Sequence, residues 1–132
     1  MFMFYAFSSQ EERKKSGGTY FIELQYCRLL PGTEIEKIVS VTAIEHWKND
    51  SLYINGDDAN KFVSNYGKII TGGIYNNRKS GMVDMYGINY YSQEQAKLIL
   101  ERIKEIKPLD YQILLSWLEK SKEHNGFYIL GL

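Results

Sequence analysis

Few residues of the kinds that build catalytic or metal centres occur in this chain. Among 132 residues there is one cysteine, Cys27, and there are two histidines, His46 and His124. A single cysteine excludes a disulfide within the chain, and neither histidine has partner ligands at the spacing of a metal site. We therefore expect no cofactor and no metal ion, and a reducing compartment, the cytoplasm.

An excess of charge and a long apolar run are also missing. Sixteen basic and sixteen acidic residues cancel, so no overall field draws the protein to nucleic acid or to an anionic membrane. No apolar run approaches the roughly 20 residues of a membrane-spanning helix. The basic clusters at 13–15 and 78–79 lie in no recognised nucleic-acid-binding motif, and we interpret them as solvated loops. Neither nucleic acid nor a membrane is expected as a direct partner.

Tyrosine, in contrast, is abundant, with 11 residues. It joins a rigid aromatic body to a hydroxyl that can stay in contact with water, which suits half-buried sheets and partner surfaces. The hydrophobic share of 44% and the charged share of 24% are typical of a globular protein. We therefore expect one globular domain over 1–132 that is built to pack and to bind, of a size to hold one core.

Strand-like segments fill most of the first ninety residues. Short polar segments predict a hairpin between the first two strands and another between the third and fourth. The spacing of Ile35, Ile38, Val39 and Thr42 also fits a short helix in place of the third strand. The predicted strands, which rest on β-branched and aromatic residues, cover about 1–7, 19–30, 38–47, 52–54, 68–75 and 82–91. The first of these is apolar but lacks a basic leader, so we do not interpret it as a signal peptide.

Three helices are predicted from caps and apolar spacing. Asp57 or Asp58 can cap a short helix that ends near residue 67, and Asp110 can cap another that runs to about 125. Between them, Ser92 begins a helix in capping-box spacing. The apolar end of the chain, 127–132, predicts a final strand. This order of elements predicts an α+β fold, with a largely antiparallel sheet packed against about three α-helices, two of them near the C-terminus.

Candidate functional side chains have competing structural roles. His124 is expected in the last turn of a helix, where the helix dipole favours an imidazolium, and His46 in a strand-and-turn region beside Trp47. Asp57 and Asp58 are interpreted first as a helix cap and its solvated neighbour. Asp84 lies on a predicted strand, where its charge must reach solvent, a cation or a partner.

Acidic and basic residues are segregated along the chain. Residues 34–58 contain six acidic residues and two lysines, a net charge of −4, whereas 61–80 contain four basic residues and no acid. Such a contrast can steer a basic partner to one surface. We therefore expect partner contacts from the aromatic and acidic residues near this segment, namely Trp47, Tyr53, Asp57, Asp58 and Asp84.

Two segments carry a resemblance to a known class of proteins. Residues 84–95, Asp-Met-Tyr-Gly-Ile-Asn-Tyr-Tyr-Ser-Gln-Glu-Gln, and 125–131, Asn-Gly-Phe-Tyr-Ile-Leu-Gly, resemble small immunity proteins of bacterial contact-dependent growth inhibition and related polymorphic-toxin systems. The resemblance covers mainly the C-terminal third. It implies a protein that binds and neutralises one cognate toxin domain, often a nuclease, inside the cell that makes it, and it identifies no binding residue.

Three functional hypotheses follow from the sequence. The first is a toxin-neutralising immunity protein without catalytic activity, whose acidic surface mimics phosphate in the basic cleft of a nuclease. The second is a small-molecule-binding or hydrolytic enzyme whose site gathers Asp84, Tyr86 and His46. The third is a structural or regulatory interaction module. The sequence does not distinguish between oligomeric states.

Overall fold

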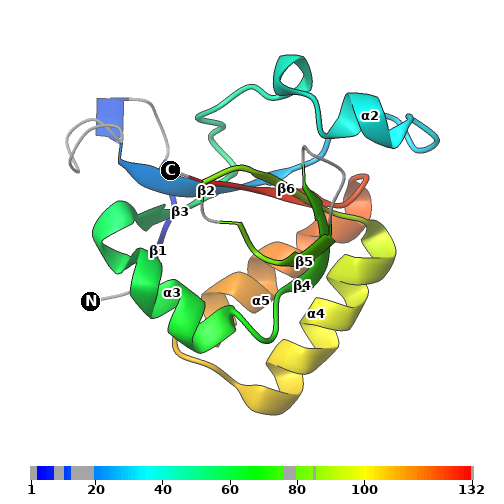
Figure 1. Cartoon of the computed structure of the whole chain (residues 1–132). Coiled ribbons are helices and arrows are strands. Elements are labelled where there is room, and N and C mark those ends of the chain that lie inside the picture. Colours follow the sequence, from blue (N-terminus) through cyan, green and yellow to red (C-terminus); the bar gives the residue numbers. More distant parts are fainter. Residues whose placement is uncertain (1–2, 8–10, 13–19, 76–79, 85, 132) are drawn as a thin grey trace.

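A computed structural model describes residues 3–7, 11–12, 20–75, 80–84 and 86–131 (Figure 1). The basic clusters at 13–15 and 78–79 and most of the polar segment between the first two predicted strands lie outside the described residues. The sheet and the helices lie within these described ranges.

One antiparallel sheet of seven strands forms the centre of the molecule. All of its pairings are antiparallel, and the strands lie in the order β1-β3-β2-β7-β6-β4-β5. The C-terminal strand is therefore central, which explains its apolar sequence. The strands are β1 (Phe4–Tyr5), β2 (Phe21–Tyr26), β3 (Leu52–Asn55), β4 (Thr71–Tyr75), β5 (Ser80–Met82), β6 (Ile88–Tyr91) and β7 (Phe127–Leu130).

Helices cover both faces of this sheet, which confirms the predicted α+β class. The described α-helices are α2 (Ile35–Ile38), α3 (Ala59–Tyr66), α4 (Gln93–Ile106) and α5 (Tyr111–Lys120). Figure 1 shows α3, α4 and α5 on one side of the sheet and α2 on the other. The larger core lies between the sheet and α3, α4 and α5, and a smaller one lies under α2.

Strand β2 illustrates how a central strand is buried on both faces. Ile22, Leu24 and Tyr26 belong to the larger core. Phe21 and Glu23 alternate with them and point to the opposite face, as the two-residue period of a strand requires. All six residues of β2 are buried, because the chain between β2 and β3 crosses this opposite face.

Neither of the two predicted hairpins forms. The helical alternative for residues 35–42 is confirmed and the strand alternative is wrong: α2 is followed by a 3₁₀ turn, η1 (Val41–Ala43). Ile38 and Val39 are buried with Cys27 in the smaller core, so burial against the sheet decides the local conformation. The first hairpin is also wrong, because β1 pairs with β3, which lies between β1 and β2.

The helix predictions near the C-terminus are confirmed, with one change of cap. The Ser92 hydroxyl accepts a hydrogen bond from the Gln95 backbone N–H at 3.2 Å and begins α4. Asp110 lies at the start of α5 but does not cap it, because its carboxylate accepts a hydrogen bond from the Met3 backbone N–H at 2.8 Å.

The predicted strand over 82–91 is divided into β5 and β6. The register of β4 shifts between Thr71 and Gly73, at Gly72, which has a positive φ of 81°.

Candidate partner-binding surface

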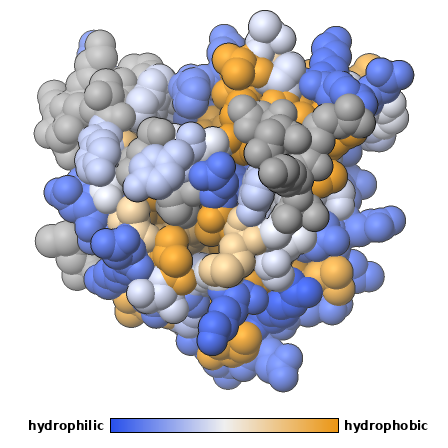
Figure 2. Space-filling model, viewed as in Figure 1, coloured by the Kyte–Doolittle hydropathy of each residue, from blue (hydrophilic) through white to orange (hydrophobic). Residues whose placement is uncertain are grey.

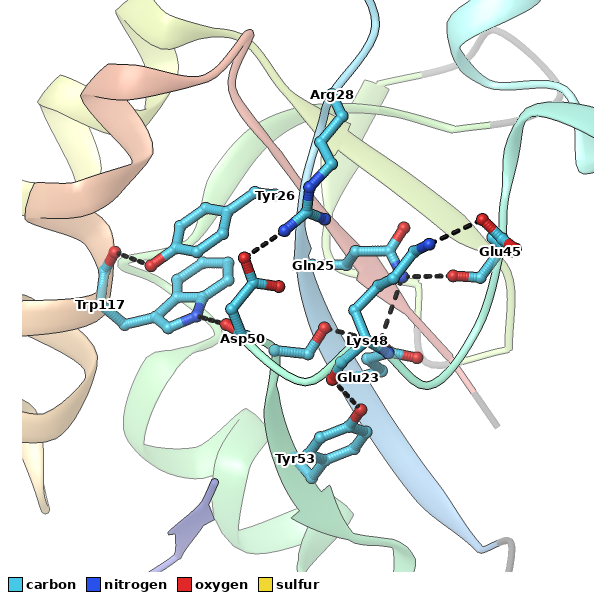
Figure 3. A network of polar contacts seen from close by, with 10 residues as sticks. Glu23, Gln25, Tyr26, Arg28, Glu45, Lys48, Asp50, Tyr53 and Trp117 are labelled. Atoms are coloured by element: carbon cyan, nitrogen blue, oxygen red, sulfur yellow. Dashed lines mark hydrogen bonds and ion pairs between the residues drawn. The ribbon is translucent and has the colours of Figure 1, made fainter. Parts of the chain in front are cut away.

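A buried carboxylate, Glu23, lies beneath the segment that returns to β3. Its side chain is 2% exposed although it belongs to the central strand β2. One oxygen, Oε1, accepts a hydrogen bond from the Trp47 backbone N–H at 2.8 Å. The other, Oε2, accepts hydrogen bonds from the Lys48 backbone N–H at 3.1 Å and from the Ser51 hydroxyl at 2.6 Å (Figure 3). The Gln25 side-chain amide donates a further one to Oε2 at 3.1 Å.

Residues 45–51, here termed the Trp47 loop, are fixed by these hydrogen bonds and by others to β2 and β3. Gln25 donates to the Glu45 carbonyl at 2.7 Å, and the Tyr53 hydroxyl donates to the Lys48 carbonyl at 2.6 Å (Figure 3). Lys48 Nζ lies 2.6 Å from Glu45 Oε2, and this hydrogen-bonded ion pair lowers the pKa of Glu45. The loop is therefore anchored to two neighbouring strands.

Trp47 is half-buried at the margin of an aromatic cluster. Its ring stacks on Tyr53, with centroids 5.6 Å apart and an interplanar angle of 14°, and meets Phe21 edge to face at 6.3 Å. Phe7 and Tyr5 complete this cluster on the face opposite α4 and α5. Tyr53 is only 1% exposed, so in this structure it supports Trp47 and does not itself offer a contact surface.

Asp57 and Asp58 lie beside this cluster, in the 3₁₀ turn η2 (Gly56–Asp58) that follows β3. The Asn55 side chain caps this turn by accepting a hydrogen bond from the Asp57 backbone N–H at 2.9 Å, and neither aspartate caps α3 with its side chain. Asp57 is exposed and Asp58 half-buried. Within the described residues, neither aspartate makes an ion pair. Both carboxylates are therefore available to a partner.

Tyr20 adds an exposed aromatic ring at the same corner. A Cβ placed on Gly56 would lie 2.1 Å from the Tyr20 ring, so the ring lies directly against that glycine, and Tyr20 is 54% exposed. Phe21, the next residue, pairs with Asn55 and contacts Trp47. We define the acidic corner as Tyr20, Trp47, Asp57 and Asp58, which lie around the start of β2 and the end of β3.

Asp84 lies at the same end of the sheet but on another strand connection. Three strand spacings, about 14 Å, separate β3 from β6. The Asp84 carboxylate accepts a hydrogen bond from the Tyr86 backbone N–H at 2.9 Å, and the buried side chain of Asn89 holds the Asp84 backbone on both sides, at 2.7 Å each. Asp84 is half-buried, whereas Tyr86 is 80% exposed. Asp84 therefore lies near the acidic corner but is not part of it.

The two histidines lie in separate environments. His46 Nδ1 is 3.8 Å from Glu23 Oε1, whereas Asp84 bonds to the Tyr86 backbone and to Asn89. No described contact therefore gathers His46, Asp84 and Tyr86 into one site. His124 follows a 3₁₀ turn, η3 (Ser121–Glu123), in extended conformation and not the last turn of a helix as predicted. Its ring stacks on Tyr26 at 4.7 Å.

A cleft of about 370 Å³ lies at the opposite end of the sheet, between the start of β3 and the end of α5. Tyr26, Asp50, Trp117 and His124 are among its lining residues. Asp50 is already paired with Arg28, and its carbonyl accepts a hydrogen bond from the Trp117 indole N–H at 2.8 Å (Figure 3). Asp50 and Trp117 are thus engaged in holding the loop and α5 together.

Apolar side chains also reach the surface over the segment that carries α2. Figure 2 shows hydrophobic residues gathered there among charged ones. Leu30 and Val41 are the most exposed of them, at 78% and 72%. They lie on the crossing segment, whose inner residues fill the smaller core.

Comparison of the chain with protein-family models, with curated proteins and with solved structures finds no match. Within the described part of the chain, every helix is too short or too polar to span a bilayer. The described residues also include no group of three or more His, Cys, Asp and Glu side chains placed to hold a metal ion. The contacts of the acidic corner are therefore the basis for a functional proposal.

The sequence predicted three members of this surface but not Tyr20 or the anchor Glu23. Glu23 alternates with apolar residues in β2, a pattern that indicates a solvent-facing side chain when one face of a strand is exposed. The signal that was present is the polar pair Glu23 and Gln25 inside an otherwise apolar and aromatic strand. Such a pair requires partners once the strand is central.

Proposed function

We propose that this protein is a toxin-neutralising immunity protein that binds and blocks a basic cognate toxin domain, a nuclease being the favoured class. The observation that carries the proposal is the acidic corner. It combines two carboxylates without an ion pair among the described residues, an exposed tyrosine and a tryptophan on an anchored loop. The resemblance of residues 84–95 and 125–131 to immunity proteins supports the same class.

Electrostatic complementarity is the physical reason for choosing a nuclease. A protein that binds the phosphates of nucleic acid presents Lys and Arg in its cleft. Carboxylates such as Asp57 and Asp58 can occupy that cleft in place of phosphates and increase the rate of association. Trp and Tyr are enriched among residues that contribute most to binding, because they bury large surfaces at small entropic cost. Trp47 and Tyr20 supply these anchors at the acidic corner.

We expect a toxin domain to be encoded beside the gene for this protein, and the direct experiment uses that domain. We expect the purified protein to form a complex with that domain and to abolish its nuclease activity at an equimolar ratio. Complex formation without inhibition would support a regulatory interaction module instead. Turnover of a small substrate by the purified protein alone would support the enzyme hypothesis that involves Asp84, Tyr86 and His46.

A further inference from the structure

The backbone of Trp47 has a conformation that residues with a Cβ rarely adopt. Its φ angle is 67°, in the left-handed region, where glycine is the favoured residue. Such a conformation persists only when surrounding contacts hold it, and it is concentrated at functional sites. One contact that acts directly on this peptide is the hydrogen bond from the Trp47 backbone N–H to Glu23 Oε1.

Glu23 and the Trp47 loop depend on each other. A buried carboxylate is costly unless hydrogen bonds compensate for the lost water. Trp47, Lys48 and Ser51 all donate to Glu23 from the loop, and Gln25 donates from β2. If the loop leaves, the carboxylate loses three of these four donors, so a single conformation of the loop is strongly favoured.

We infer that Glu23 is a positioning residue for partner binding: it holds the Trp47 loop in the one conformation that the basic toxin domain contacts. This inference rests on the proposed function. Glu23 itself is buried and touches no partner. Its effect on affinity arises because the apparent dissociation constant increases as the population of the competent conformation decreases.

Glu23→Gln is the sharpest variant, because it preserves shape and changes one acceptor into a donor. An amide supplies one oxygen and one NH₂ group, whereas both carboxylate oxygens accept hydrogen bonds from N–H or O–H donors of the loop. In either orientation of the amide, its NH₂ group then faces at least one N–H donor of the loop, and that hydrogen bond is lost. Ser51→Ala is a milder second variant, which removes only the hydroxyl at 2.6 Å from Oε2.

The measurement combines binding with ¹⁹F NMR of protein labelled with 5-fluorotryptophan, in which Trp47 and Trp117 give separate resonances. For Glu23→Gln we expect a shifted or broadened Trp47 resonance and a Kd for the toxin domain about tenfold higher, as a decrease of the competent population to about a tenth requires. Ser51→Ala should change both in the same direction by less. Ser92→Ala, which removes the cap of α4, is the control with a stability loss away from the loop and should change neither.

The outcomes separate this inference from the proposed function. If Glu23→Gln moves the Trp47 resonance but leaves Kd unchanged, the loop is not a partner contact and the inference is overturned, while toxin neutralisation stands. An unchanged Trp47 resonance in both variants would show that Glu23 does not position the loop. If the wild-type protein does not bind the toxin domain at all, both the inference and the proposed function are wrong.

Discussion

Tyr26 and Trp117, 91 residues apart in the sequence, stack ring on ring with centroids 4.1 Å apart and an interplanar angle of 9°. The Tyr26 hydroxyl also donates a hydrogen bond of 2.7 Å to the Trp117 carbonyl. This pair joins the central strand β2 to helix α5. The pair therefore attaches α5 to one end of the sheet, and the acidic corner lies at the other end.

Removal of the Tyr26 hydroxyl tests this attachment. We expect Tyr26→Phe to lower the free energy of unfolding by about 1 kcal/mol, because the ring stack remains but a buried hydrogen bond is lost. Urea denaturation measures the change. Tyr86→Phe, at a side chain that is 80% exposed, is the matched control and should leave the urea midpoint unchanged. Equal midpoints for Tyr26→Phe and wild type would show that the hydrogen bond does not stabilise the fold.

The buried face of α4 is expected to be purely structural. Ile99 is fully buried, whereas its neighbour Leu98 is 44% exposed. Ile99→Ala should cost about 2–5 kcal/mol, and Ser92→Ala about 1 kcal/mol through loss of the cap. Leu98→Ala should have little effect on the thermal midpoint. The folded fraction of each variant should still bind the partner, and an Ile99→Ala midpoint equal to that of wild type would contradict the assignment of this face to the core.

Gly126 precedes the central strand β7 and has a positive φ of 79°. A Cβ at this position would lie 2.1 Å from the Tyr91 carbonyl oxygen, which is backbone and does not move easily. Gly126→Ala should therefore destabilise the protein by about 2–5 kcal/mol, from backbone strain together with overpacking. Gly32 also has a positive φ, of 90°, but nothing within 4 Å of a new Cβ, so Gly32→Ala should cost about 1 kcal/mol. Similar losses for both variants in urea denaturation would indicate that the contact at Gly126 relaxes.

Alkaline stability depends on the buried tyrosines. Burial raises the pKa of Tyr90 to about 12, from an ordinary value of 10.0, and also raises the pKa values of Tyr26, Tyr66, Tyr91 and Tyr128. Because the folded state holds these phenols in the neutral form, their contribution to stability is complete below pH 10 and decreases above it. For Tyr90 the contribution is lost as the pH rises from 10 through about 12.

Urea midpoints measured together with tyrosinate absorbance test this dependence. Between about pH 10 and 12 the urea midpoint should decrease, and tyrosinate from the buried residues should appear together with unfolding. Tyr90→Phe should make the decrease less steep, because one of these groups is removed. Ionisation of the buried tyrosines in a protein that remains fully folded, with a constant midpoint, would contradict the burial shown here.

Local signals in the sequence account for the correct predictions. Helix α4 was predictable because Ser92, Gln95 and the apolar stripe lie within one short segment. The pairing of β1 with β3 was not, because it places Phe4 opposite Ile54 and so depends on contacts between distant segments. The β-branched residues of 38–44 favoured a strand, yet the structure uses them to cover a sheet face.

In the candidate surface, too, local features were predictable and contacts between distant segments were not. Trp47, Asp57 and Asp58 were identified from composition and charge, which are visible in the sequence. The left-handed backbone of Trp47 carries no sequence signal, because the residue is not glycine. Glu23 becomes an anchor only because a loop 24 residues further along the chain returns to it. Tertiary structure alone brings these two residues together.

The central claim is that Asp57 and Asp58 attract a basic toxin domain to the acidic corner. The most direct test measures the association rate of that domain with wild type and with Asp57→Lys/Asp58→Lys at low and high salt. The control, Glu101→Lys/Glu105→Lys, changes the net charge equally at exposed positions of α4. We expect Asp57→Lys/Asp58→Lys to slow association more than the control does, with a difference that shrinks as salt screens the attraction. Equal association rates for the two double variants at low salt would contradict the assignment of the acidic corner as the binding surface.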